Sequence, residues 1–169
     1  SFTGEISYEL HSAMADSVEL WRRLLKLGAD LGIRPHGLET LLKLRLEKGH
    51  IVVGQDTDFD STPRRLNQEW AVKLDKSDFV GKQAIQRTNR VPLDRQLVGL
   101  EMAGPAPHEG AVIWHGSEYA GYVTSSAFSP VLGKAVMLGW LKLFGGELPG
   151  EVTIDQRAAQ RVATPFYDP

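Results

Sequence analysis

The chain has 169 residues, of which 42% are hydrophobic and 24% are charged, a composition typical of a globular protein with one larger or two small domains. The 19 basic and 21 acidic residues give a net charge of −2 with no long run of either sign, which argues against a nucleic-acid-binding protein. No segment approaches the ~20 consecutive apolar residues of a membrane-spanning helix. Without cysteine there is no disulfide framework, thiolate nucleophile or sulfur-ligated zinc, and we expect a cytoplasmic protein without nucleic-acid or membrane partners.

The first third of the chain predicts a strand followed by a helix. Residues 2–10 alternate apolar and polar side chains with a period of two, which is typical of a half-buried strand. Asp16, followed three positions later by Glu19, indicates a helix start, and apolar residues then recur at helical spacing until Gly32 can end the helix. The helix is expected to be amphipathic scaffold, and the strand needs a partner.

A leucine-rich segment, residues 37–48, predicts a second helix with an arginine on its apolar side. Its leucines, at positions 38, 41, 42, 44 and 46, spread over an arc of roughly 200° on a helical wheel, so we expect the helix to be largely buried. Arg45 falls near the middle of that arc. A buried guanidinium needs partners, and the pattern alone leaves a structural ion pair and a polar or anionic ligand equally open. The polar loop GQDTD, residues 54–58, follows closely and would complete a site.

The middle of the chain predicts a domain boundary. Residues 70–74 alternate as another strand, and Asp78 is placed to cap a short helix. The polar, proline-containing segment 88–95 then separates two regions of different character. We expect an α+β protein with domains at residues 1–90 and 95–169.

The second region predicts a small β-barrel or sandwich, because short candidate strands alternate with Gly, Pro and Ser punctuation. His115, Gly116 and Ser117 are typical of a tight hairpin turn. Residues 125–133 are expected to form a longer polar loop that reaches out of the barrel. The six strands are predicted at residues 96–102, 111–114, 118–125, 135–141, 151–154 and 161–164.

Several stretches form a recognisable series by their order and spacing. They are FTGE at 2–5, GLETLLKLRLEKG at 37–49, GQDTD at 54–58, DFVGK at 78–82, LVGL at 97–100 and GYVTSSAFSPVLG at 121–133. This series resembles the C-terminal half of the aminomethyltransferase family, the T-protein of glycine cleavage. Within that family, the second and third stretches and the closing PFYDP at 165–169 most resemble the folate-binding region of the α subunit of heterotetrameric sarcosine oxidase.

The resemblance implies a fold and a chemistry. The fold is a partial α/β folate-binding domain followed by a small C-terminal β-barrel. The ligand is tetrahydrofolate, which takes up a one-carbon unit to give 5,10-methylenetetrahydrofolate during N-methylglycine (sarcosine-type) oxidation or aminomethyl transfer. Any flavin would belong to other domains or subunits. A noncatalytic folate-binding or subunit-interface module of the same fold is the alternative.

The resemblance also implies binding residues. Glu9 matches the position whose carboxylate takes the pterin, where two acceptor oxygens suit the donors of the pyrimidine edge; by its pattern alone it is a solvent-facing strand residue. Arg45 matches the family arginine near the folate. Phe2 stands where tyrosine is usual, so it can stack or pack but not donate from a hydroxyl, and Glu5 is a further, weaker candidate.

Two departures from the family pattern limit what this chain is expected to do alone. Thr40, Leu41 and Leu42 replace the Ala-Arg-Asp of T-proteins, which favours the oxidase-like branch. The family's acid/base carboxylate lies in an N-terminal half that these residues do not include, so no catalytic residue is assigned, and a preceding half or a partner subunit is expected to complete the enzyme. Alone, the chain should show no one-carbon transfer and weak or no folate binding.

The five histidines lack metal-ligand spacing, so no metal site is predicted.

Overall fold

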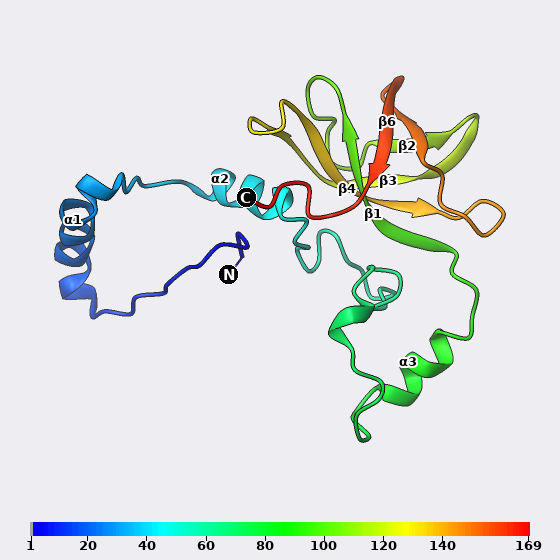
Figure 1. Cartoon of the computed structure of the whole chain (residues 1–169), viewed down its shortest axis with the longest axis horizontal. Helices are drawn as coiled ribbons and strands as arrows, with labels where there is room; N and C mark the ends of the chain where they lie inside the picture. The colour runs from blue at the N-terminus through cyan, green and yellow to red at the C-terminus, as the bar shows by residue number, and fades with distance from the viewer. Residues whose placement is uncertain (1) are drawn as a thin grey trace.

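The computed structural model describes residues 2–169, in which a closed β-barrel follows an N-terminal part made of short helices and long connections (Figure 1). Within this range the helices are α1 (Ser17–Leu27), α2 (Leu38–Glu47) and α3 (Lys82–Thr88), with 3-10 turns at Met14–Asp16, Ala29–Leu31 and Glu69–Ala71. The strands are β1 (Arg95–Met102), β2 (Val112–His115), β3 (Glu118–Ser129), β4 (Lys134–Lys142), β5 (Glu151–Ile154) and β6 (Arg157–Val162).

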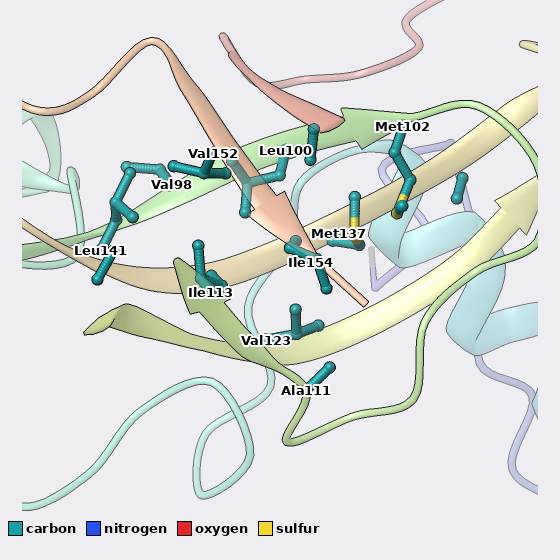
Figure 2. Close-up of a cluster of buried hydrophobic side chains, with 13 residues drawn as sticks. Val98, Leu100, Met102, Ala111, Ile113, Val123, Met137, Leu141, Val152 and Ile154 are labelled. Carbon is teal, nitrogen blue, oxygen red and sulfur yellow. The ribbon is translucent and has the colours of Figure 1, made fainter. Parts of the chain in front are cut away.

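The barrel closes in the order β1-β4-β3-β2-β5-β6, and all neighbouring strands are antiparallel. Its interior is filled by apolar side chains that every strand contributes, including Leu100, Ile113, Val123, Met137 and Ile154 (Figure 2). Inward-facing residues alternate with outward-facing ones along a strand, so the period-two pattern of the sequence produces this core directly. The predicted barrel is confirmed.

A second hydrophobic cluster lies outside the barrel and positions the site. It consists of Leu46 of α2 packed with Leu97, Ala127, Val136, Leu138 and Trp140 from β1, β3 and β4. Strand β4 is therefore buried on both faces over most of its length, because the interior covers one face and the end of α2 covers part of the other. The barrel is the surface on which the end of α2 is fixed.

The strand predicted at residues 2–10 is absent, and that prediction was wrong. The segment is irregular, and the side chains of Ile6 and Tyr8 are 89% and 85% exposed. A strand requires a neighbour to bond its N–H and C=O groups, and no described strand of this chain pairs with the segment. Glu9, predicted to lie on this strand, is exposed in the connection instead.

Helix α1 forms as predicted but is not packed against the barrel. None of its residues is buried, and Figure 1 shows it standing apart from the barrel at the end of extended connections. Asp16 occupies the N-cap position without a side-chain hydrogen bond, so the predicted capping box does not form. The α-helix ends at Leu27, and a 3-10 turn continues to Gly32, whose left-handed conformation (φ 74°) stops it.

Helix α2 forms as predicted, but the expectation that it is largely buried was wrong. Leu38 is 79% exposed and Leu42 is 43% exposed, whereas the last turn, Arg45, Leu46 and Glu47, is buried. The helix meets the barrel through its C-terminal turn, so only leucines near that end find apolar neighbours.

Two further predictions in the middle of the chain were wrong. Residues 70–74 form no strand but begin in a 3-10 turn, and Trp70 is 71% exposed, because no described strand lies alongside to pair with them. Asp78 does not cap α3; its carboxylate accepts from the N–H of Phe79, and Gly81 takes the N-cap position.

The barrel strands follow the prediction with two corrections. The hairpin turn at Gly116 and Ser117 is confirmed. The last strand lies at 157–162 rather than 161–164, because Asp155 and Gln156, both with positive φ, form the β5–β6 turn without the glycine that signals such a turn. Residues 125–129, predicted as part of a loop, belong to β3, and the hydroxyls of Ser125 and Ser129 bond to α2 and to the loop that follows it.

Candidate functional site

The C-terminal end of α2 is fixed by a glycine. The N–H of His50 donates to the C=O of Arg45 at 2.9 Å and the N–H of Gly49 to that of Leu46 at 2.8 Å, the pair of bonds of a Schellman motif. Gly49 has φ 69°, and a Cβ at this position would lie 2.7 Å from Cβ of Thr164. Only glycine adopts this left-handed backbone readily and also has no Cβ to clash with Thr164, so Gly49 sets where the chain leaves the helix.

Arg45 is 2% exposed and holds the helix end to the barrel. Its Nη1 donates to Oδ2 of Asp56 at 2.9 Å and to the C=O of His50 at 3.0 Å, and its Nη2 donates to Oγ of Ser125 at 2.7 Å. The structural ion pair left open by the sequence is therefore present. A buried charge without such partners would be strongly destabilising.

Asp56 is fully buried and accepts from four groups. Besides Arg45, they are the N–H of Val52 at 2.8 Å and the hydroxyls of Thr124 at 2.5 Å and Ser125 at 2.6 Å. Backbone and hydroxyl donors satisfy both oxygens, the condition under which a buried carboxylate is tolerated. The residue joins the GQDTD loop to both α2 and β3.

A second buried carboxylate, that of Glu47 at the end of α2, also bonds to β3. Its Oε1 accepts from Oγ of Ser129 at 2.5 Å, and its C=O accepts from the N–H groups of Phe166 and Tyr167, both at 2.9 Å. The C-terminal segment thus lies across the end of α2. Ser125 and Ser129, which lie in the stretch predicted as a loop, are therefore partners of polar residues of α2 and of the loop that follows it.

Phe2 and Glu5 lie beside the same helix end. The C=O of Phe2 is 3.1 Å from Nδ1 of His50, and Phe2 as a whole is 41% exposed. Nζ of Lys48 lies 2.8 Å from Glu5 and 2.5 Å from Asp168. Hydrogen bonds to Asp168 and Glu5, opposed in part by desolvation, raise the pKa of Lys48 above its ordinary value.

Glu9 is not brought to this cluster. Its carboxylate lies on the irregular segment that follows, 3.7 Å from Nε2 of His11, with both side chains about nine-tenths exposed. Of the four binding residues predicted from the sequence, the structure therefore gathers Phe2, Glu5 and Arg45 around the end of α2 and leaves Glu9 in solvent.

The loop after Asp56 is tied to the first barrel strand by ion pairs. Nη2 of Arg95 lies 3.0 Å from Asp58, and its guanidinium stacks 4.7 Å from the ring of Trp140. Partial burial acts to raise the pKa of Asp58, but hydrogen bonds from Ser61 and from the N–H of Asp60, together with Arg95, outweigh it and lower that pKa.

The sequence pointed to Arg45 but did not single out the residues that bond to it. Asp56 could have been proposed as the partner of Arg45, because it lies in a polar loop soon after a helix whose arginine needs a counter-charge. Ser125 and Thr124 carried no usable signal, since they are about 80 positions from Arg45 along the chain and only the barrel brings them close.

Two classes of feature are not found in the described part of the chain. No described helix is long and apolar enough to cross a membrane. No group of three or more His, Asp or Glu side chains among residues 2–169 is arranged to hold a metal ion.

Known proteins match this chain along nearly its whole length. The family model described as the GCVT N-terminal domain matches residues 1–76, and the one described as the glycine cleavage T-protein C-terminal barrel domain matches residues 95–168. The aminomethyltransferase of Halothermothrix orenii is 37% identical over 151 residues, which cover 89% of this chain and 42% of that protein. The aminomethyltransferase of Picosynechococcus is 37% identical over 173 residues, covering 98% and 46%.

A solved structure shows the same arrangement. The crystal structure of glycine cleavage system aminomethyltransferase T from Bartonella henselae superposes with a TM-score of 0.76 at 27% identity, over 89% of this chain and 44% of that one. The chain thus spans less than half the length of the relatives it matches.

Proposed function

The chain belongs to the aminomethyltransferase family, that of the glycine cleavage T-protein, and on that premise we propose that it is the tetrahydrofolate-binding part of a one-carbon transfer enzyme. The observation that carries the proposal is the match of both family models, one to the helical part and one to the barrel, in their order along the chain. When bound, the reduced folate supplies the nitrogens that take up a carbon at the oxidation level of formaldehyde, giving 5,10-methylenetetrahydrofolate.

The predicted binding residues suit a reduced folate in type. The ring of Phe2 is partly exposed and available for stacking, and Glu9 presents two carboxylate oxygens to solvent that can accept from a pyrimidine edge. Arg45 is proposed to position this surface rather than to contact the ligand directly. Its ion pair with Asp56 fixes the helix end and the loop against which the ligand would lie.

The exposed apolar residues of the N-terminal segment support a two-part site. The apolar side chains of Ile6 and Tyr8 are exposed although they alternate like those of a strand, and the relatives are more than twice as long as this chain. We propose that a preceding half, in the same or a partner polypeptide, pairs with this segment, carries Glu9 to the folate and supplies the acid/base carboxylate. The isolated chain is then expected to show no transfer activity and weak or no folate binding.

The branch of the family is a finer proposal. Leu41 and Leu42 stand where T-proteins carry Arg and Asp, and the closing residues 165–169 resemble those of the sarcosine oxidase α subunit. We propose that the carbon comes from oxidation of an N-methylglycine-type amine at a flavin held by another domain or subunit. Transfer from an aminomethyl carrier is the competing source, and the curated relatives bear the aminomethyltransferase name.

Calorimetric titration with tetrahydrofolate tests the proposal. The chain is titrated alone and after mixing with the part of the Halothermothrix orenii aminomethyltransferase that it does not match. Binding should appear or strengthen in the mixture, and Glu9→Ala should weaken it while Glu19→Ala, on exposed α1, should not. If the two parts associate and no folate binds, the proposed function fails; folate binding without methylene transfer from any supplied donor would favour the noncatalytic module.

A further inference from the structure

The ammonium group of Lys48 lies between the two end segments of the chain. Its Nζ is 2.8 Å from Oε1 of Glu5 and 2.5 Å from Oδ1 of Asp168. The side chain of Lys48 is 12% exposed, whereas those of Glu5 and Asp168 are 57% and 65% exposed. An ammonium has three N–H donors and can serve two carboxylates at once. A largely covered cation therefore joins the N-terminal and C-terminal segments at the end of α2.

The aliphatic part of Lys48 packs directly against the backbone of Gly4. A Cβ at Gly4 would lie 2.5 Å from Cγ and 2.7 Å from Cδ of Lys48, so only a residue without a side chain allows this approach. Two positions earlier, the C=O of Phe2 is 3.1 Å from Nδ1 of His50. Residues 2–5 are thus held at both ends, by Lys48 and by His50.

Lys48 itself takes its position from a rigid part of the molecule. It is the C-cap residue of α2, directly after the buried last turn, and its N–H donates to the C=O of Leu44 at 3.2 Å. The C-terminal segment is fixed to the same helix end, because the N–H groups of Phe166 and Tyr167 donate to the C=O of Glu47. The barrel therefore determines, through α2, where the ammonium lies.

We propose that Lys48 is a positioning residue for ligand binding. Through its bonds to Glu5 and Asp168 it holds the segment that carries Phe2, so that the ring is in place before a reduced folate binds. We call Lys48, Glu5 and Asp168 the Lys48 strap. Glu5 serves in this strap as a counter-ion and does not contact the ligand. The identity of the ligand rests on the proposed function, whereas the ordering of residues 2–5 is measured without any ligand.

Backbone order parameters from ¹⁵N NMR relaxation of the full chain test the strap. Lys48→Met keeps an unbranched side chain against Gly4 but removes the ammonium, and the exposed carboxylates it leaves stay hydrated, so the barrel should remain folded. The order parameters of Gly4, Glu5 and Asp168 should fall from about 0.8 to below about 0.6, while that of Leu46 stays unchanged.

Two further variants separate the strap from a general effect of charge on α2. Lys48→Arg keeps a cation that can bond both carboxylates and should retain most of the order of residues 4 and 5. Lys43→Met, which removes an exposed pair with Glu39 on the same helix, should leave that order unchanged. Unchanged order parameters at Gly4 and Glu5 in Lys48→Met would overturn the proposal.

Tetrahydrofolate titration of the chain mixed with the completing half tests the positioning role. Lys48→Met should bind about tenfold more weakly, because the freed segment must then be ordered on binding, and Lys48→Arg should restore most of the affinity. Glu5→Gln should weaken binding similarly, and the double variant Lys48→Met with Glu5→Gln should bind no more weakly than either single one.

The outcomes distinguish this inference from the proposed function. Additive losses in the double variant would mean that Glu5 contacts the folate directly, and would overturn the role given to it here. Lost order in Lys48→Met with unchanged folate affinity would overturn the positioning role and leave the proposed function intact. No folate binding by the parent mixture would refute the proposed function, and the positioning role would fall with it, even where the order parameters showed the strap to be present.

Discussion

Nη1 of Arg45 lies 2.9 Å from the Asp56 carboxylate, and neither side chain is more than 3% exposed. The two residues come from α2 and from the loop that follows it, and both also bond to Ser125 of β3. One buried ion pair therefore fixes three segments to each other. Its desolvation is offset only while both charges are present, so removing either one has a larger effect than removing both.

Asp56→Ala should destabilise the chain by about 3–5 kcal/mol, because it leaves the guanidinium of Arg45 buried and unpaired. Urea denaturation followed by tryptophan fluorescence measures this loss. Lys43→Ala, which removes an exposed pair on the same helix, should change stability by less than about 0.5 kcal/mol. The double variant Arg45→Met with Asp56→Leu should lose less than Asp56→Ala alone; a loss below about 1 kcal/mol for the single variant would show that the pair is not structurally important.

Gly49→Ala should destabilise the chain by about 2–4 kcal/mol, because it combines a left-handed backbone with a new Cβ 2.7 Å from that of Thr164. Gly150→Ala is the matched control, since no atom lies within 4 Å of its Cβ position and its φ is not in the left-handed region. The two thermal midpoints can be compared by circular dichroism. Equal midpoints would mean that the end of α2 adjusts to the added methyl group.

The stability contributed by the loop after α2 should depend on acid pH. The folded pKa of Asp58 lies below its ordinary value of 3.8, so its contribution is complete above that value and is lost as the pH falls through the lower, folded pKa. Urea midpoints measured from pH 5 to pH 2.5 should fall more steeply in the parent than in Asp58→Asn, which has no such group to titrate. Parallel curves for the two proteins would rule out this contribution.

Residues 5–34 should be cleaved long before the barrel. α1 has no buried residue, and local opening is easiest where few apolar contacts must break. Brief digestion with trypsin, followed by mass spectrometry, should give first cuts at Arg22, Arg23 or Lys26, while the barrel persists as a large fragment. First cuts within the strands of the barrel would contradict this, and protection of α1 on mixing with the completing half would support the two-part site.

The sequence by itself determined the features that depend on neighbouring residues. Period-two alternation and the His115-Gly116-Ser117 turn specify the barrel strands, because inward and outward side chains follow from the pleat of each strand. Helical spacing specifies α1 and α2 for the same kind of reason, and Arg45 could be recognised as a charge on an apolar face. The resemblance to the aminomethyltransferase family is likewise found from the order and spacing of short stretches along the chain.

The tertiary structure alone decided the features that need a distant partner. Residues 2–10 have the pattern of a strand, but no described strand lies beside them to form a sheet. Most leucines of α2 stay exposed because only its last turn reaches the barrel. The sequence indicates that Arg45 needs a partner. Its partner Ser125 lies 80 positions further along the chain, and the pairing of β3 with β4 brings it into contact with Arg45. A hydrogen bond depends on distance in space, and a local pattern shows that one is required without showing which residue makes it.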